Sequence, residues 1–531
     1  MADELIKVAE DSARGGFFLV SGSALATVIM AIGSILVGRF LGPELYGQYT
    51  LALVVPQLLF IFTDLGINQG IIKFTASLRS KGETNRLTKI IKYGLLLRAS
   101  TGIAIFIINY AFADLFASFI LQRPDLAFYI RIASTSVLFQ VIFTTATSAF
   151  VGLDKTEYNA LTTNIQAIAK AIISIALVLL GFSVAGAIIG YMASYIVAAV
   201  ASISILLLII REKQNVQNNY SISDDLKALI RYGAPLYISL LLTGFLPLYQ
   251  RILLAIFTTD AEIGNYNAAS NFVALMAVLS VPITTTLLPA FSKLDSSTNQ
   301  KIKAFFKLAN KYTALIIVPI TFLIIIFSKE IVNVIYGSTY QSASLFLATF
   351  CLVYFLVGLG YFTLSSFYNG LGETKTTLKM SLLAFITLVF LSPVLTKTYS
   401  VLGLIVASLT TSTISTVYGS YIARKNFRLE FDTRQIIKIY LISAVCSVPS
   451  VLLLYLTSLP KLFNIIIGGL LYLFIYATLT PLTKIVNTSE LQTVTHITQK
   501  IRLLAFIVKP ILKYQQKLLH IRQTSRNSTE K

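Results

Sequence analysis

Apolar segments long enough to cross a lipid bilayer recur along almost the whole chain. A transmembrane helix needs about 20 apolar residues to cross about 30 Å of hydrocarbon, and most of the segments meet or approach this length. They lie near residues 16–38, 46–66, 93–114, 130–150, 162–181, 184–209, 232–257, 268–291, 313–327, 343–368, 379–395, 401–422, 436–456 and 462–482. This pattern predicts an all-α, polytopic membrane protein with about fourteen transmembrane helices.

The composition fits a lipid solvent better than water. Of the 531 residues, 56% are hydrophobic and 12% are charged, whereas soluble domains are about 25% charged. The first residues mix acidic and basic side chains, unlike a cleavable signal peptide. We therefore expect the first helix to remain as an anchor.

Lysine and arginine are concentrated in alternate loops. The loops on the side of the N-terminus and the C-terminal tail carry most of them, whereas the opposite loops carry Arg39, Arg123, Lys329, Lys397 and Lys461. Because basic residues accumulate in cytoplasmic loops, we expect a protein of the cell membrane with both termini in the cytoplasm. This asymmetry accounts for most of the net charge of +20, so the charge requires no nucleic-acid partner.

Glycines recur at equivalent helix boundaries in the two halves of the chain. The pairs are Gly47 and Gly264, Gly152 and Gly370, and Gly186 and Gly403, at offsets of 217 or 218 residues. Chance recurrence of a common residue is the alternative. A repeat of six helices keeps both copies in the same orientation and predicts two lobes related by an axis along the membrane normal.

The repeat sets the expected domain organisation. It consists of a cytoplasmic N-terminal segment (1–15), an N-lobe (16–210), a C-lobe (211–425), two further helices (426–482) and a basic amphipathic cytoplasmic tail (483–531).

Tyrosines are expected to form the aromatic belt at the membrane interface, because tryptophan is absent. We assign Tyr46, Tyr49, Tyr266, Tyr336 and Tyr340 to the outer belt.

Four cations inside or at the ends of membrane segments are candidate binding residues, since such charges are costly and tend to face a cavity or a partner. Lys170 lies about 12 Å deep at 1.5 Å per residue, where its amine cannot easily reach the headgroups. Arg251 follows Pro247, which indicates a kinked helix beside a cavity. Arg98 and Arg39 lie nearer the membrane surface. For each cation, a cavity-facing role and a structural or interfacial role are both open.

Few acidic residues lie within the membrane segments. Asp64, near the inner end of the second segment, could pair with Lys73 or Arg98, or bind a cation. Asp260 and Glu262 lie in the loop before the eighth segment and are expected to be solvated. Because the inventory is cationic and Arg and Lys bind phosphate well, the sequence favours an anionic substrate.

Motifs for enzymatic chemistry are missing from the sequence. It contains no Walker motif and no catalytic carboxylate pair, and its loops are too short to hold an enzymatic domain. We therefore expect a transporter rather than an enzyme, with no cofactor and no metal site. Coupling to Na⁺ or H⁺ stays open.

A series of motifs resembles those of one transporter family. The segment 37–49, VGRFLGPELYGQY, is similar to the opening motif of O-antigen-type flippases for polysaccharides and oligosaccharidyl-lipids. These belong to the multidrug/oligosaccharidyl-lipid/polysaccharide exporter superfamily. The segments 64–66, 264–269 and 368–372 continue the resemblance in order and spacing, over roughly residues 12–425.

The resemblance implies two lobes around a central cavity. It implies that the protein flips a polyprenyl- or dolichyl-linked (pyro)phosphate glycan to the outer leaflet by alternating access, for surface polysaccharide or glycoprotein synthesis. Arg39, Arg98, Lys170 and Arg251 match cavity cations that would hold the anionic headgroup. The implied partners are this glycan, membrane lipids and a glycan polymerase or glycosyltransferases, around a monomeric protein.

Two alternatives stay open. A cation-coupled multidrug exporter should carry deep carboxylates, and a non-transporting scaffold for glycan assembly has only the basic tail in its support. Many relatives carry Asp where this chain has Gln250, so an ion-coupling role does not transfer to that position.

Overall fold

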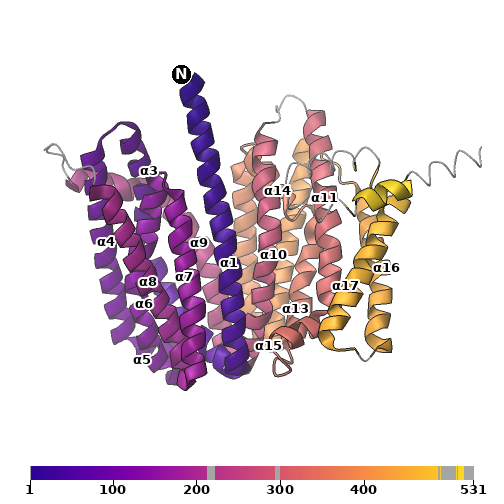
Figure 1. Ribbon diagram of the computed structural model, residues 1–531, viewed down its shortest axis with the longest axis horizontal. Helices are drawn as coiled ribbons and strands as arrows, with labels where there is room; N and C mark the ends of the chain where they lie inside the picture. The colour runs from indigo at the N-terminus through magenta and orange to yellow at the C-terminus, as the bar shows by residue number, and fades with distance from the viewer. Residues whose placement is uncertain are drawn as a thin grey trace, which may run out of the picture. The chain divides into compact units, whose positions relative to one another are not determined.

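The computed structural model describes residues 2–211, 222–293, 299–457, 459–487, 491, 510 and 512–519. Within these ranges all regular structure is helical (Figure 1). Most of the predicted amphipathic tail (483–531) lies outside the described residues.

The helices of the first half begin and end as follows: α1 (Ala2–Ala52), α2 (Val54–Ile61), α3 (Ile67–Ser80), α4 (Thr84–Ala111), α5 (Ala113–Leu115), η1 (Phe116–Ile120), η2 (Pro124–Leu126), α6 (Ala127–Gly152), α7 (Thr156–Leu177), η3 (Val178–Phe182), α8 (Ser183–Arg211) and α9 (Ile222–Phe257). The second half contains α10 (Asp260–Ser292), α11 (Asn299–Ile326), α12 (Ser328–Ile335), α13 (Ala343–Cys351), η4 (Leu352–Leu359), α14 (Thr363–Gly370), α15 (Thr374–Phe427), α16 (Thr433–Leu456) and α17 (Lys461–Leu482).

Eight helical stretches in the described part of the chain are long and apolar enough to cross a membrane, and the bent pair Ala343–Leu359 and Thr363–Gly370 makes a ninth. Three of the eight are 44 to 55 residues long, which is about twice the length of one span. Each of the three contains a break with positive φ, at Gly42 (77°), Gly181 (91°) or Ser400 (54°). If each of these three stretches is divided at its break, the resulting spans, the bent pair, α9 and α10 together make about fourteen spans. The prediction of an all-α polytopic membrane protein is confirmed.

The predicted repeat is visible in the backbone at two pairs of turns. Asp154 and Gly372 follow equivalent helix ends with φ of 58° and 78°, and the next amide of each donates to a carbonyl five residues earlier at 2.8 Å. Ser183 (φ 48°, ψ −131°) and Ser400 (φ 54°, ψ −139°) form the second pair. Because positive φ is rare for residues other than glycine, two matching serines at one offset are strong evidence for a structural repeat.

The repeated glycines mark close backbone contacts. A Cβ atom on Gly186 would lie 3.0 Å from the Leu177 carbonyl oxygen, and one on Gly403 would lie 1.8 Å from that of Leu395. Glycine at both positions lets each helix approach the end of the preceding helix. This requirement explains why the glycine pairs could be found in the sequence.

The chain divides into two compact units, which we describe separately. Unit 1 contains residues 1–278, 336–343 and 392–404, and unit 2 contains residues 279–335, 344–391 and 405–531. The lobe boundaries expected from the sequence stay predictions.

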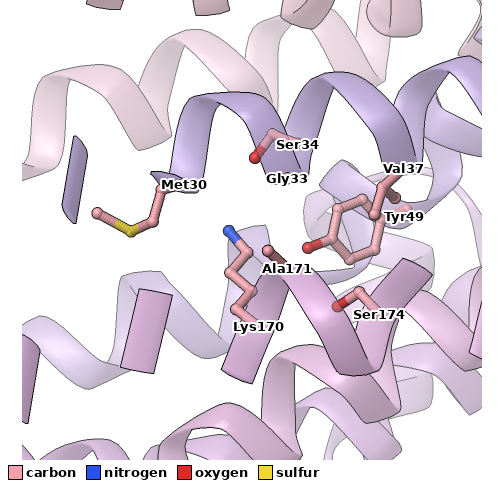
Figure 2. Close-up of a pocket in the computed structure, with 8 residues that line it drawn as sticks. All are labelled: Met30, Gly33, Ser34, Val37, Tyr49, Lys170, Ala171 and Ser174. Carbon is pink, nitrogen blue, oxygen red and sulfur yellow. The ribbon is translucent and has the colours of Figure 1, made fainter. Parts of the chain in front are cut away.

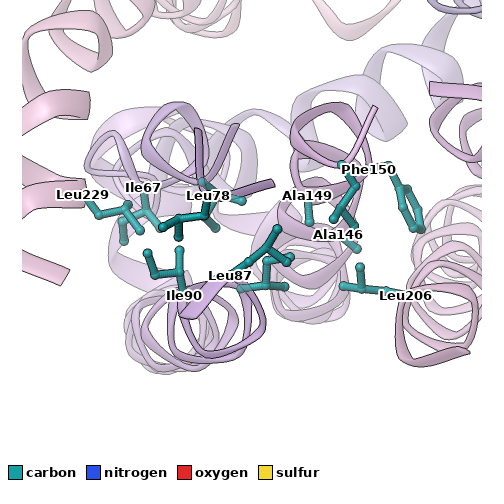
Figure 3. Packing of buried hydrophobic residues seen from close by; sticks show 12 residues of the cluster. Ile67, Leu78, Leu87, Ile90, Ala146, Ala149, Phe150, Leu206 and Leu229 are labelled. Carbon is teal, nitrogen blue, oxygen red and sulfur yellow. The ribbon is translucent and has the colours of Figure 1, made fainter. Parts of the chain in front are cut away.

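Each unit has its own buried core. In unit 1, Ile67, Leu87, Ile90, Phe150 and Leu229 pack where α3, α4, α6 and α9 meet (Figure 3). In unit 2, Phe291, Phe306 and Phe367 pack ring against ring, with centroids 5.4 to 6.4 Å apart.

Candidate anion-binding site

Lys170 projects from α7 toward α1 inside unit 1 (Figure 2). The two helices approach closely because Gly33 of α1 faces Ala171: a Cβ on Gly33 would lie 2.8 Å from the Ala171 Cβ. The half-buried Lys170 amine lies 5.4 Å from the ring centroid of Tyr191. It borders a cavity of about 10 Å³ shared with Tyr49, which has room for about one water molecule.

Arg251 of α9 lies in the same region of unit 1. It is half-buried and lies within electrostatic range of Lys170 and of four tyrosines, which are Tyr46, Tyr49, Tyr191 and Tyr266. Among the described residues, neither Lys170 nor Arg251 takes part in an ion pair or a protein hydrogen bond. Two positive charges within electrostatic range of each other on two membrane helices, neither paired with a described carboxylate, form a site that an anion would stabilise.

The tyrosines assigned to the outer belt are buried instead. Tyr46, Tyr49, Tyr266, Tyr336 and Tyr340 are 2%, 4%, 8%, 1% and 2% exposed. The interfacial interpretation of these five residues is therefore wrong. Their position near helix ends resembles that of a belt, but the sequence does not show that other helices cover them.

A reciprocal helix crossing buries part of this tyrosine cluster. A Cβ on Gly47 would lie 2.0 Å from the Asp260 carbonyl oxygen, and one on Gly264 would lie 1.8 Å from that of Pro43. The crossing thus pairs equivalent positions of the repeat, and Asn267 donates a 2.9 Å hydrogen bond to Thr50 beside it. The repeated Gly-X-Tyr motif was the sequence signal that could have placed these tyrosines inside.

Two amide side chains donate hydrogen bonds to buried tyrosine hydroxyls. The Asn271 amide donates to the hydroxyls of Tyr46 and Tyr336 at 3.0 and 2.9 Å. The Gln57 amide donates to the Tyr191 hydroxyl at 3.3 Å. Sequence reasoning singled out neither amide, because a lone Asn or Gln in an apolar segment carries no motif.

Arg98 lies in a different polar network of unit 1 and is 1% exposed. Its guanidinium donates to the hydroxyls of Thr63 (2.6 Å), Thr144 (3.3 Å) and Thr145 (3.3 Å), and lies 4.0 Å from the Asp64 carboxylate. This arrangement favours the structural-pairing alternative for Arg98. A cavity of about 210 Å³ borders the network and is lined in part by Asp64 and Arg98.

Two further predicted site residues are exposed. Lys73 is exposed, and its amine lies 3.6 Å from the ring centroid of Tyr232. Arg39 is exposed on α1 shortly before the break at Gly42. Substrate contact by Arg39, Arg98, Lys170 or Arg251 stays a prediction.

Asp260 is paired rather than simply solvated. Its carboxylate lies 3.5 Å from the Arg123 guanidinium and accepts a 3.3 Å hydrogen bond from Gln48. Arg123 also donates to the Thr258 carbonyl oxygen. The pair joins the segment between η1 and η2 to the start of α10, within unit 1.

We expect Arg123→Ala to loosen the contact between Arg123 and the start of α10, and so to make the nearby tyrosine cluster more accessible to solvent. An ion pair of this exposure is worth about 1 kcal/mol, so labelling of an introduced Tyr49→Cys thiol by a membrane-impermeant maleimide should be about fivefold faster. Arg131→Ala, which removes the exposed pair with Asp114, should leave the rate unchanged. Equal rates for both variants would show that the Arg123 pair does not hold the site closed.

Sequence comparison supports the family suggested by the motifs. A family profile described as "Polysaccharide biosynthesis protein" matches residues 12–295. The probable low-salt glycan biosynthesis flippase Agl15 of Haloferax volcanii is 21% identical over 238 residues, which are 43% of this chain and 49% of that protein. The chain therefore spans about half the length of this relative.

Structure comparison shows the fold. Lipid II flippase MurJ in an inward closed conformation aligns with a TM-score of 0.67 and 18% identity, over 87% of this chain and 98% of that one. An inward-facing multidrug resistance transporter of the MATE family aligns with a TM-score of 0.59 and 16% identity, over 76% and 94%. At these identities the similarity establishes a shared fold and nothing beyond it.

Proposed function

Because the chain belongs to the polysaccharide biosynthesis protein family of the multidrug/oligosaccharidyl-lipid/polysaccharide exporter superfamily, we propose that it flips a lipid-linked oligosaccharide across the cell membrane. The substrate is a polyprenyl or dolichyl (pyro)phosphate glycan, moved from the cytoplasmic to the outer leaflet. The protein acts as a transporter and performs no covalent chemistry on the glycan.

The observation that carries this proposal is the pair of cations without acidic partners. Lys170 and Arg251 lie within electrostatic range of each other, so both would attract an anionic (pyro)phosphate. Hydrogen bonds between a cation and a phosphate are about twice as strong as neutral ones, and more so where water is scarce. The substrate phosphate would supply the negative charge that the described residues around the pair do not.

The tyrosine cluster supports a glycan as the rest of the cargo. The buried hydroxyls of Tyr46 and Tyr191 and the half-buried amides of Gln57 and Asn271 offer both donors and acceptors. Sugars present hydroxyl groups and apolar ring faces, which match hydroxyls and aromatic rings. A hydrophobic organic cation would instead be repelled by Lys170 and Arg251.

Transport of a defined lipid would test the proposal. The purified protein in vesicles should move a polyprenyl-diphosphate oligosaccharide to the opposite leaflet, measured by its accessibility to an added glycosidase. Expression in a drug-sensitive host should give no resistance to cationic drugs. Drug resistance without movement of the glycolipid would identify a multidrug exporter and overturn the proposal.

A further inference from the structure

An apolar groove lies on unit 2, beside the bend between α13 and α14. The cavity measures about 340 Å³, and its apolar wall includes Phe355, Leu359, Ile436, Ile437 and Leu441. These residues come from η4 and from α16. All of them belong to unit 2, so the groove is separate from the cation pair of unit 1.

The groove exists because α16 is held against an irregular helix. The stretch Ala343–Leu359, which ends in η4, meets α14 at a bend of 45°, and η4 itself has the tighter 3-10 form. The Tyr440 hydroxyl of α16 donates to the Phe355 carbonyl oxygen and accepts from the Gly358 amide at 3.2 Å. A Cβ on Gly358 would lie 2.8 Å from Ile436, so the close approach depends on glycine.

The exposed rim of the groove faces the lipid. Ile437 and Leu441 are 56% and 60% exposed, on a helix whose mean hydropathy reaches 2.1. Exposed apolar side chains on a membrane-crossing helix contact lipid rather than water. A groove with apolar walls does not hold ordered water, and hydrocarbon chains are the solvent that reaches it.

A cation lies at one end of this apolar surface. Arg424, in the last turn of α15, lines the groove, and its guanidinium lies 5.1 Å from the ring centroid of Phe431. In the described part of the chain, Arg424 takes part in no ion pair. Thr433 lines the groove as well. Arginine recognises phosphate through a planar fork of donors, and cations at the cytoplasmic membrane surface attract anionic lipids.

We propose that this groove binds one anionic glycerophospholipid, with an acyl chain along the apolar wall and its phosphate on Arg424. One guanidinium matches the single negative charge of a phosphodiester. Phospholipid is also the bulk solvent of the protein, so mass action favours it over a scarce carrier lipid. The bound lipid would fill the space between η4 and α16 and brace the bend. This inference does not depend on the identity of the transported substrate.

Native mass spectrometry of the full chain, released from detergent and titrated with phosphatidylglycerol, tests the site. Wild type should retain one lipid more tightly than any others. Arg424→Ala should weaken this binding about tenfold, the value of one charge-assisted hydrogen bond. Lys425→Ala is the matched control, because it removes the same charge from the neighbouring position, which does not line the groove. It should bind like wild type.

A second variant tests whether the apolar wall of the groove binds the acyl chain. Ile437→Trp adds bulk at the exposed rim, where folding tolerates it, and should also remove the retained lipid. Equal affinity of wild type, Arg424→Ala and Ile437→Trp would overturn the proposal. Retention of polyprenyl phosphate but not phosphatidylglycerol would overturn it as well, since the groove would then serve the carrier lipid.

Discussion

The double variant Lys170→Ala, Arg251→Ala is expected to abolish glycolipid flipping while leaving a folded protein. Each charge-assisted contact to phosphate is worth about 1.5–3 kcal/mol, so loss of both should weaken substrate binding about 100-fold or more. Initial rates of flipping in vesicles, measured at substrate concentrations well below saturation, would report this loss directly.

The same variant should be at least as stable as wild type without substrate. Lys170 and Arg251 repel each other and have no acidic partner among the described residues, so their removal relieves an unfavourable interaction in a poorly solvated region. A site that costs stability in order to bind its ligand is a recurrent feature of functional proteins. Thermal unfolding in detergent, with and without the glycolipid, measures both effects.

Two controls separate binding from general damage. Lys170→Arg keeps the charge and should retain partial transport, whereas Lys92→Ala removes an exposed lysine of α4 and should change neither rate nor stability. Wild-type flipping by the double variant would rule out the cation pair as the phosphate site. A large loss of stability in the double variant would show instead that the two cations have structural partners.

The fold was largely predictable because each of its determinants is local in the sequence. The length of each apolar segment limits it to a membrane-spanning helix, and glycines such as Gly403 recur where a backbone contact excludes a Cβ. The repeated serine turns at Ser183 and Ser400 could not be foreseen, since serine has no preference for positive φ.

The site was less predictable because its contacts join distant segments. Depth along a helix singled out Lys170, but no pattern shows that it lies in electrostatic range of Arg251 on α9. An apolar segment that is hydrophobic on every side gives no periodicity from which to choose its buried face. For the same reason Tyr46 looked interfacial, and Asp260 looked solvated until its pairing with Arg123 was seen.

Arg98→Met is expected to destabilise the protein strongly, in contrast to the variants at Lys170 and Arg251. The Arg98 guanidinium is buried and donates to three threonine hydroxyls beside Asp64. Its removal leaves the partly buried Asp64 carboxylate without a nearby cation, and loss of one partner of a buried pair costs about 3–5 kcal/mol. Thermal unfolding in detergent should therefore show a large downward shift.

Partial rescue would identify the cause of this loss. Adding Asp64→Asn to Arg98→Met removes the stranded charge and should restore part of the stability, because a neutral amide costs less to bury than a carboxylate. Thr145→Val removes one acceptor and should cost about 1 kcal/mol. If Arg98→Met instead unfolded like wild type but no longer moved the glycolipid, the guanidinium would serve the substrate rather than the fold. The cavity of about 210 Å³ beside Asp64 and Arg98 would then be the place to look for the bound phosphate.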